Sequence, residues 1–282
     1  YNGSAWVQVG ADIDGEAAND SSGYSVSLSS DGSRVAIGAY ANDGNGTNSG
    51  HVRIYNYNGS AWVQVGADID GEATSDNSGW SVSLSSDGSR VAIGAYANDG
   101  NGTNSGHVRI YNYNGSAWVQ VGADIDGEAA DDYSGNSVSF SSDGSRVAIG
   151  AENNDGNGSN SGHVRIFSYT PSGVSSWTQV GADIDGEAAN DSSGYSVSLS
   201  SDGSRVAIGA RGNDGNGSNS GHVRIFSYTP SGVSSWTQVG LDIDGEAAGD
   251  QSGRSVSLSS DGSRVAIGAR GNAGNGSESG HV

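Results

Sequence analysis

Apolar and polar residues alternate in short runs along the whole chain, and one set of runs returns five times. In the first set, the runs lie at residues 6–9, 25–29, 34–39 and 51–57. A period of two is typical of a β-strand with one buried face. No stretch of helical periodicity is long enough to predict a helix. Each set therefore predicts four short strands.

Two turn signals indicate how these strands pair. Asp31-Gly32 lies between the second and third runs, and Asn58-Gly59 joins the fourth run to the first run of the next copy. Asp-Gly favours a tight hairpin in which both central residues have positive φ. We therefore expect the second run of each copy to be the innermost strand of a sheet. The third run, the fourth run and the next copy's first run follow outward.

The five sets are copies of one unit, and the fourth and fifth copies carry a three-residue insertion in the second hairpin, first at residues 170–176. Four strands per copy predict an all-β fold, a five-bladed β-propeller with four antiparallel strands per blade. The first copy begins with an outer strand at residues 1–9 that has no blade of its own, and the last copy lacks one. We expect the N-terminal strand to complete the last blade and close the ring, which would remove two exposed edges. A slice of a larger ring or array is the alternative. The predicted single domain covers residues 1–282, with repeats at 1–56, 57–112, 113–168, 169–227 and 228–282.

Three short motifs in each copy resemble a known repeat. In the first copy they are SGYSVS at 22–27, VAIGA at 35–39 and SGHVRIY at 49–55. They resemble the FG-GAP repeat of integrin α-subunit propellers, and the resemblance covers nearly the whole chain. It implies a propeller with extracellular, adhesive or ligand-binding duties. Two departures are that Ser22 stands where the family has Phe, and that no Pro follows Ala39. The family's calcium loop between its first two strands is replaced here by a tight turn, so its calcium sites do not carry over.

The charge balance excludes several classes of partner. The chain has 32 acidic residues against 12 basic ones, all of them Arg, and a formal net charge of −20. Such acidity argues against nucleic acid and anionic membranes as partners. No apolar run approaches the roughly 18 residues of a membrane span, so no membrane insertion is expected. The predicted strand order places 27 acidic residues and three arginines on the loops of one face, which we call the acidic face.

Dense like charge on one face favours a bound cation, and Ca²⁺ takes six to eight oxygen ligands. The loop Asp43-Gly44-Asn45-Gly46-Thr47 offers oxygens at alternate positions. Ordinary turn chemistry, with Asp and Asn capping their own backbone, is the alternative, and solvation in high salt is another. The candidate calcium ligands are Asp43, Asn45, Asp99, Asn101, Asp155, Asn157, Asp214 and Asn216, with Asp12, Asp14 and Glu16 as a second, weaker set.

The copies diverge at a few positions, and these positions fall on the acidic face. Near-identical scaffolds that carry different aromatic, Arg and amide groups are typical of a recognition surface. Neutral drift after duplication is the alternative, although the opposite hairpins hardly vary. The predicted ligand-binding residues form two sets: Tyr24, Trp80, Asn136, Tyr195 and Arg254, and Tyr40, Tyr96, Glu152, Arg211 and Arg270.

Neither the histidines nor the tryptophans indicate a shared site. Equivalent histidines such as His51 and His107 are expected about 20 Å apart, because they lie two strand spacings of about 4.8 Å from the innermost strand. Each is therefore predicted to cap its own strand, and the outer-strand tryptophans are predicted to pack between blades. Near-identical copies supply the same groups five times, and no nucleophile elbow, phosphate loop or His-Glu zinc motif occurs. The sequence predicts that the chain is not an enzyme.

Together these features predict an extracellular or cell-surface propeller that binds a protein or glycan ligand through its acidic face, with Ca²⁺ as the candidate cofactor. Two alternatives remain. One is a structural subunit of a surface array or fibre, self-associating through unpaired terminal strands. The other is a carbohydrate-binding lectin, since aromatic residues beside amides and carboxylates suit sugars.

Overall fold

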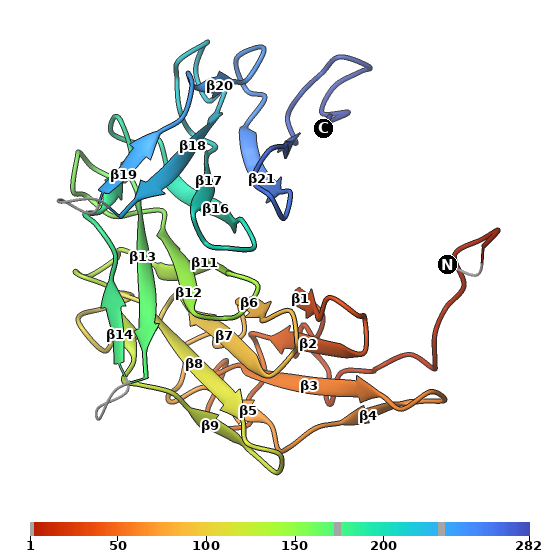
Figure 1. Cartoon of the computed structure of the whole chain (residues 1–282). Coiled ribbons are helices and arrows are strands. Elements are labelled where there is room, and N and C mark those ends of the chain that lie inside the picture. The colour runs from red at the N-terminus through yellow and green to blue at the C-terminus, as the bar shows by residue number, and fades with distance from the viewer. Residues whose placement is uncertain (1–2, 172–175, 231–234) are drawn as a thin grey trace.

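The computed structural model describes residues 3–171, 176–230 and 235–282, and over these the chain is all β, with no helix. The strands form five antiparallel sheets that follow one another around an arc, as Figure 1 shows. This confirms the predicted all-β class and is consistent with a propeller, whereas it does not establish the predicted number of blades. Part of the inserted hairpin at 170–176 and the first two residues of the predicted N-terminal strand lie outside the described residues.

Each of the first four sheets has four strands in chain order from the inside outward, plus one two-residue strand. The first sheet holds β1 (Ser25–Leu28), β2 (Arg34–Ala39), β3 (His51–Tyr57), β4 (Trp62–Gln64) and β5 (Ile69–Asp70). The second holds β6 (Ser81–Leu84), β7 (Arg90–Ala95), β8 (His107–Tyr113), β9 (Trp118–Gln120) and β10 (Ile125–Asp126). The third holds β11 (Ser134–Phe140), β12 (Arg146–Ala151), β13 (His163–Thr170), β14 (Ser176–Gln179) and β15 (Ile184–Asp185). The fourth holds β16 (Ser193–Leu199), β17 (Arg205–Ala210), β18 (His222–Thr229), β19 (Ser235–Gln238) and β20 (Ile243–Asp244). The fifth sheet has only β21 (Ser252–Leu258) and β22 (Val265–Ala269).

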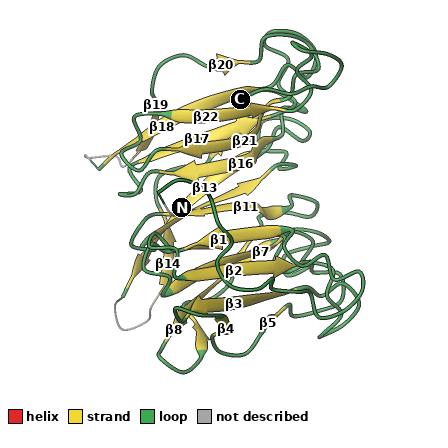
Figure 2. Cartoon of the chain, turned by 90° about the vertical axis from the view of Figure 1, so that its right-hand side faces the viewer, coloured by secondary structure: helices red, strands yellow, loops and turns green. Residues whose placement is uncertain are grey.

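This strand order confirms the predicted order, including the contribution of each outer strand by the next copy. In the first sheet β1 pairs with β2, β2 with β3, and β3 with β4, where Tyr57 lies opposite Trp62. The two-residue strands were not predicted, because two residues carry no periodic signal. β5 pairs with the start of β3, so the chain leaving one sheet stays bonded to it before crossing to the next. Figure 2 shows the sheets edge-on, with the loops gathered at the two ends of the strands.

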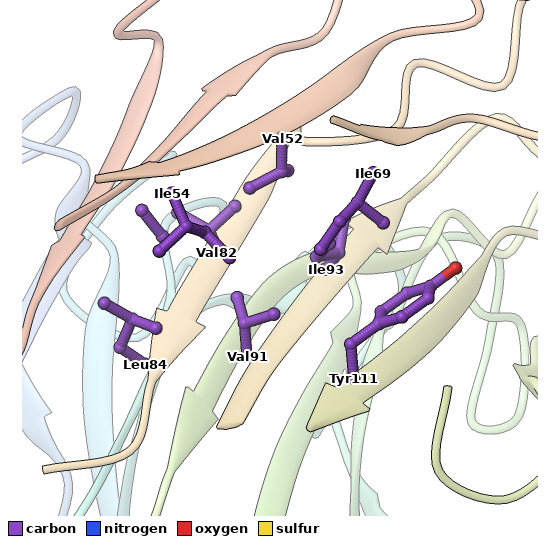
Figure 3. Packing of buried hydrophobic residues seen from close by; sticks show 9 residues of the cluster. Val52, Ile54, Ile69, Val82, Leu84, Val91, Ile93 and Tyr111 are labelled. Carbon is purple, nitrogen blue, oxygen red and sulfur yellow. The ribbon is translucent and has the colours of Figure 1, made fainter. Parts of the chain in front are cut away.

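The core lies between neighbouring sheets rather than within one. Val52 and Ile54 of β3 pack with Val82 and Leu84 of β6 and with Val91 of β7, as Figure 3 shows. Equivalent clusters lie at the next two sheet boundaries. Strand alternation sends these residues to one side, and the following sheet covers them. Buried apolar surface is worth about 25 cal/mol per Å², so each boundary stabilises both sheets that form it.

Neighbouring sheets also touch through their backbones, which explains a glycine in each second strand. A Cβ on Gly38 would lie 2.0 Å from the carbonyl oxygen of Gly79 in the following sheet. No larger residue fits there without moving one sheet. The hydroxyl of Ser25 donates to the same carbonyl at 2.7 Å, so the contact is polar as well as close.

The hairpin between β1 and β2 differs from the one predicted. Gly32 has φ of 70°, but Asp31 does not adopt a positive φ. The Asp31 carboxylate instead accepts hydrogen bonds from the Ser29 hydroxyl and from the backbone and hydroxyl of Ser33. These bonds lower the pKa of Asp31 to about 2. The prediction that both central residues have positive φ was wrong. Only Gly32 has a positive φ, because hydrogen bonds to the Asp31 carboxylate stabilise the turn in another conformation.

Closure of the ring by the N-terminal strand is not confirmed. Residues 3–9 form no strand, and the side chains of Val7 and Val9 are exposed. An outer strand pairs with a third strand, as β4 pairs with β3, and in the fifth sheet the only residues at that position are His281 and Val282. These two offer too little edge for pairing. Figure 1 accordingly shows the first and last sheets at the two ends of the arc.

Candidate functional site

The residues that vary between copies meet in one continuous surface at the inner part of the acidic face. In its first half the ring centres of Tyr24 and Trp80 lie 4.4 Å apart, and those of Trp80 and Tyr96 lie 4.5 Å apart. Tyr40 packs edge-on against both Tyr24 and Trp80. Tyr133 extends the group by an edge contact with Tyr96. The sequence placed these residues on one face, and the structure joins them across three copies into an aromatic cluster.

The second half of this surface is charged. The Arg211 guanidinium lies 3.2 Å from a carboxylate oxygen of Glu152 and 4.3 Å from the ring centre of Tyr195. Arg254 lies over the same ring at 5.2 Å. Burial raises the pKa of Glu152, and neighbouring Arg211 and Arg254 oppose that shift. Arg270 is exposed and lines, with Arg254 and Tyr195, a cavity of about 310 Å³.

One hydrogen-bonded residue links the two halves. Asn136 accepts a hydrogen bond from the Trp80 indole at 3.0 Å and donates one to the Tyr195 carbonyl at 3.3 Å. All ten predicted ligand-binding residues therefore lie on the two halves of this surface, which we call the variable rosette. Whether they bind a ligand stays a prediction.

The backbone beneath the rosette is held in an uncommon conformation. In every copy one residue that is not glycine has a left-handed φ, and it lies three positions before the first-set rosette residue, as Ser21 lies before Tyr24. These residues are Ser21, Asn77, Tyr133, Ser192 and Gln251, with φ from 52° to 57°. Non-glycine residues adopt such angles only when the surroundings require it, and such positions gather at functional sites.

Buried aspartates next to these residues hold the loops in place. Asp76 is 3% exposed and accepts hydrogen bonds from the backbone of Glu72 and Ala73 and from the Asn98 amide. A buried carboxylate with three donors fixes the loop that leads to the rosette. These aspartates stabilise the loops, so fewer carboxylates are accessible to a ligand on the acidic face than a count of its acidic residues implies. The equivalents are Asp20, Asp132, Asp191 and Asp250.

The first set of predicted calcium ligands is engaged in turn contacts. Asp43 accepts a hydrogen bond from the Asn48 backbone at 2.8 Å. The amide nitrogen of Asn45 donates to the carbonyls of Gly71 and Glu72, so this group is used to hold the crossing loop. Both contacts recur in copies two to four. The Asp43 contact is the kind that the turn-chemistry alternative predicts, whereas Asn45 bonds to a loop distant in sequence. Calcium binding by these loops stays a prediction.

The second set is spread over different partners. Asp12 accepts a hydrogen bond from the Gln8 amide at 2.8 Å. The Asp14 carbonyl accepts one from Arg53 at 2.7 Å, and a Glu16 carboxylate oxygen lies 3.6 Å from another nitrogen of Arg53. The loop is thus held against β3 of the following sheet by one arginine.

Four histidines are buried, and three of the outer tryptophans are half-buried at sheet boundaries. His51, His107, His163 and His222 are each 1% exposed, at the start of a third strand. The Trp118 indole donates to the Val65 carbonyl of the preceding sheet at 2.8 Å and packs on the core there, and Trp177 and Trp236 pack in the same way. These three tryptophans have the packing role that was expected, whereas Trp6 is 88% exposed. Sequence reasoning considered the histidines one by one and missed their neighbours. The signal was present in Glu, His-x-Arg and Gln-x-x-x-Asp elements that recur unchanged in copy after copy.

A protein-family comparison now bears on the resemblance. The model of the FG-GAP repeat matches residues 12–55, 68–111 and 182–226, which lie in the first, second and fourth copies. These three segments match the FG-GAP repeat, as the resemblance predicted. No curated protein sequence matches the chain. Each matched segment supplies the three inner strands of one sheet.

Solved structures show the same fold at low sequence identity. A putative 6-phosphogluconolactonase from Bacteroides uniformis is 11% identical, with a TM-score of 0.54 over 86% of this chain and 57% of that one. The periplasmic gluconolactonase PpgL of Pseudomonas aeruginosa is 17% identical, with 0.57 over 86% and 64%. Hydrazine synthase of Kuenenia stuttgartiensis is 14% identical, with 0.52 over 86% and 70%. The chain thus spans 57% to 70% of the length of these structures.

These neighbours correct one prediction. The sequence led us to predict that this chain is not an enzyme, but two of these neighbours are named lactonases, so the same fold occurs in proteins named as enzymes. That prediction was wrong, because motif absence does not exclude catalysis on this fold. At this identity the likeness shows the fold alone.

In the described ranges, the structure contains no helix with the length and apolar character needed to cross a membrane.

Proposed function

We propose that the chain is a recognition module that acts outside the cell or at its surface and binds a ligand through the variable rosette. The observation that carries this proposal is the contact between the variable residues themselves. Positions 56 to 59 residues apart in sequence touch across copies, as Trp80 and Asn136 do at 3.0 Å. Drift at independent exposed positions would not require such contacts.

The two halves of the rosette indicate the chemistry of the ligand. The aromatic cluster offers rigid contact area, and Arg211, Arg254 and Arg270 are the only arginines on the acidic face. Arginine binds carboxylates with two parallel hydrogen bonds. A ligand with an apolar or sugar body and an anionic group fits both halves. An acidic carbohydrate is therefore the ligand class we propose, which unites the recognition and lectin alternatives.

Binding to an array of neutral and acidic glycans tests this proposal. The wild-type chain is expected to bind acidic glycans, and Arg254→Ala is expected to weaken binding tenfold or more, because a charged hydrogen bond is worth about 1.5–3 kcal/mol. Arg264→Ala is the matched control, since Arg264 lies on the opposite face of the same copy and is exposed. An array without signal, or equal binding by both variants, would remove the rosette as a glycan site.

A second candidate function has a separate observation in its favour. Val26 and Leu28 of β1 are 64% and 58% exposed on the side where each later sheet receives a neighbour. The fifth sheet, in turn, presents the corresponding face of β22, but it lacks the third strand that completes this face at the inner boundaries. A second copy of the chain would fit there head to tail, as an array subunit would. Sedimentation over a wide concentration range tests it, and a single 28.2 kDa species throughout would exclude it.

A further inference from the structure

A glutamate, a histidine and an aspartate converge in four places near the outer edge of the acidic face, three of them at sheet boundaries and one at the open side of the first sheet. Each group draws its glutamate from the loop that leads into the inner strand, its histidine from the start of the third strand, and its aspartate from the loop after the outer strand. The ligand atoms of each group lie within 4.8 Å of one another. The groups are Glu16, His51 and Asp68; Glu72, His107 and Asp124; Glu128, His163 and Asp183; and Glu187, His222 and Asp242.

The second group shows the geometry. The Nδ1 atom of His107 lies 3.9 Å from Oε2 of Glu72 and 3.8 Å from Oδ2 of Asp124. Both separations exceed a hydrogen bond, so neither carboxylate is a direct partner of the imidazole. Around a tetrahedral ion with bonds of about 2.0–2.1 Å, ligand atoms lie about 3.4 Å apart. The two separations between His107 and the carboxylates exceed that spacing by about half an ångström.

The second oxygen of each carboxylate is already held. Oε1 of Glu72 lies 3.5 Å from a guanidinium nitrogen of Arg109, and Oδ1 of Asp124 accepts a hydrogen bond from the Gln120 amide. The remaining oxygens, Oε2 and Oδ2, are the ones that face the histidine. Outer partners that orient ligating carboxylates in this way are typical of metal sites. The other three groups repeat the arginine and glutamine contacts.

The histidine supplies an independent indication. The imidazoles are 1% exposed, and Nε2 of His51, His163 and His222 has no hydrogen-bond partner among the described residues. Leaving a buried polar side chain without partners costs about 1–3 kcal/mol. Nδ1, the other ring nitrogen, is the atom that faces the two carboxylates.

We propose that each of these four groups binds one divalent first-row transition-metal ion of the zinc type through His Nδ1, Glu Oε2 and Asp Oδ2. Imidazole with two carboxylates suits Zn²⁺, whereas Ca²⁺ takes oxygen ligands. The groups share Glu16 with the second predicted calcium set and share no residue with the first set. In the three groups at sheet boundaries the glutamate lies on the loop that crosses from the preceding sheet, so bound metal would tie those two sheets together. Three protein ligands also leave one coordination position open.

The fifth copy provides an internal comparison. His281 lies 3.8 Å from Glu246, but His281 is 39% exposed and no aspartate joins this pair within the described residues. Two ligands from exposed side chains hold a metal far more weakly than three from an oriented site. The expected stoichiometry is therefore four ions per chain rather than five.

Calorimetric titration of Zn²⁺ into the full chain, after removal of metal with a chelator, tests the proposal. Four ions are expected for the wild type and three for Asp124→Asn, which keeps all five histidines. Asp99→Asn is the matched control, because Asp99 lies on the same face and in the copy that supplies Glu72 and His107 but outside the groups, and it is expected to retain four. A visible absorption band with Co²⁺ in place of Zn²⁺ would report the imidazole ligand, and it should fall by a quarter in Asp124→Asn. A hundredfold excess of Ca²⁺ should displace little Zn²⁺.

Two results would overturn the assignment. One is the absence of Zn²⁺ binding at millimolar metal by a chain that melts cooperatively. The other is an unchanged stoichiometry when Glu16, Glu72, Glu128 and Glu187 are all replaced by Gln, because binding would then come from the acidic face at large. Gln120→Ala distinguishes positioning from general loss of structure, since it should weaken one site about tenfold and leave the other three unchanged.

Discussion

The inner strands β1 and β6 have the same sequence, SVSL, and opposite environments. In β6, Val82 and Leu84 are 9% and 7% exposed, whereas Val26 and Leu28 of β1 are 64% and 58% exposed. The difference is a neighbour: β6 is covered by the first sheet, and no sheet lies on the same side of β1 within the described residues. A repeat in this protein therefore has no core of its own. Its apolar face becomes a core only where two sheets meet.

Leu84→Ala and Leu28→Ala test this comparison with the largest expected effect. Truncating a buried leucine removes transfer energy and leaves a cavity, which costs about 2–5 kcal/mol. An exposed leucine loses almost nothing, about 0.5 kcal/mol or less. Urea unfolding monitored by tryptophan fluorescence should place the Leu84→Ala midpoint well below the wild type and leave that of Leu28→Ala close to it.

The reverse outcome is equally informative. If Leu28→Ala costs as much as Leu84→Ala, the exposed face of β1 is covered in solution. The effect should then depend on protein concentration, because the cover would be a second copy. Equal losses that do not change with concentration would contradict a core that forms only where two sheets meet.

A smaller effect is expected where the sheets touch through their backbones. A Cβ on Gly94 would lie 2.1 Å from the carbonyl oxygen of Gly135 in the following sheet. The equivalent Gly268 of the last sheet meets only the movable Ser255 hydroxyl at close range. Gly94→Ala is expected to destabilise the chain by about 1–3 kcal/mol, because forced overpacking costs that much. Gly268→Ala should be near neutral in the same unfolding measurement, and an equal loss in both would assign the cost to the strand rather than to its neighbour.

A feature of this fold was predictable from the sequence when its signal lies within a few neighbouring residues. Strand order and hairpins were predictable, because alternation and Asp-Gly or Asn-Gly turns act over a few residues. The difference between Leu28 and Leu84 was not predictable, since it depends on a neighbouring sheet built from another copy of the repeat. The same holds for the contact of Trp80 with Asn136: variation identified the residues, and only the strand arrangement shows that they touch.

The candidate metal groups were not predicted from the sequence for a similar reason. The histidines were compared with each other around the ring, and the expected distance between them excluded a shared site. Each histidine instead meets a glutamate from a loop of its own copy and an aspartate from the next copy. No local spacing connects Glu72, His107 and Asp124. The register of three different segments brings them together.

The smallest expected effect concerns one hydroxyl per sheet. The hydroxyl of Ser83 accepts a hydrogen bond at 3.0 Å from the backbone of Phe140 in the next sheet, and Ser27, Ser139 and Ser198 do the same at the other boundaries. Ser257 is the equivalent in the last sheet and is exposed, with no following sheet among the described residues. Ser83→Ala leaves a backbone N–H without its partner and is expected to cost about 1 kcal/mol. Ser257→Ala should change the unfolding midpoint by less than the error of the measurement. Hydrogen exchange sharpens the test, because only in Ser83→Ala should the amide of Phe140 lose protection. A loss confined to that amide would place the hydrogen bond at the boundary itself, whereas equal exchange in both variants would mean that the sheet, and not its neighbour, protects the strand.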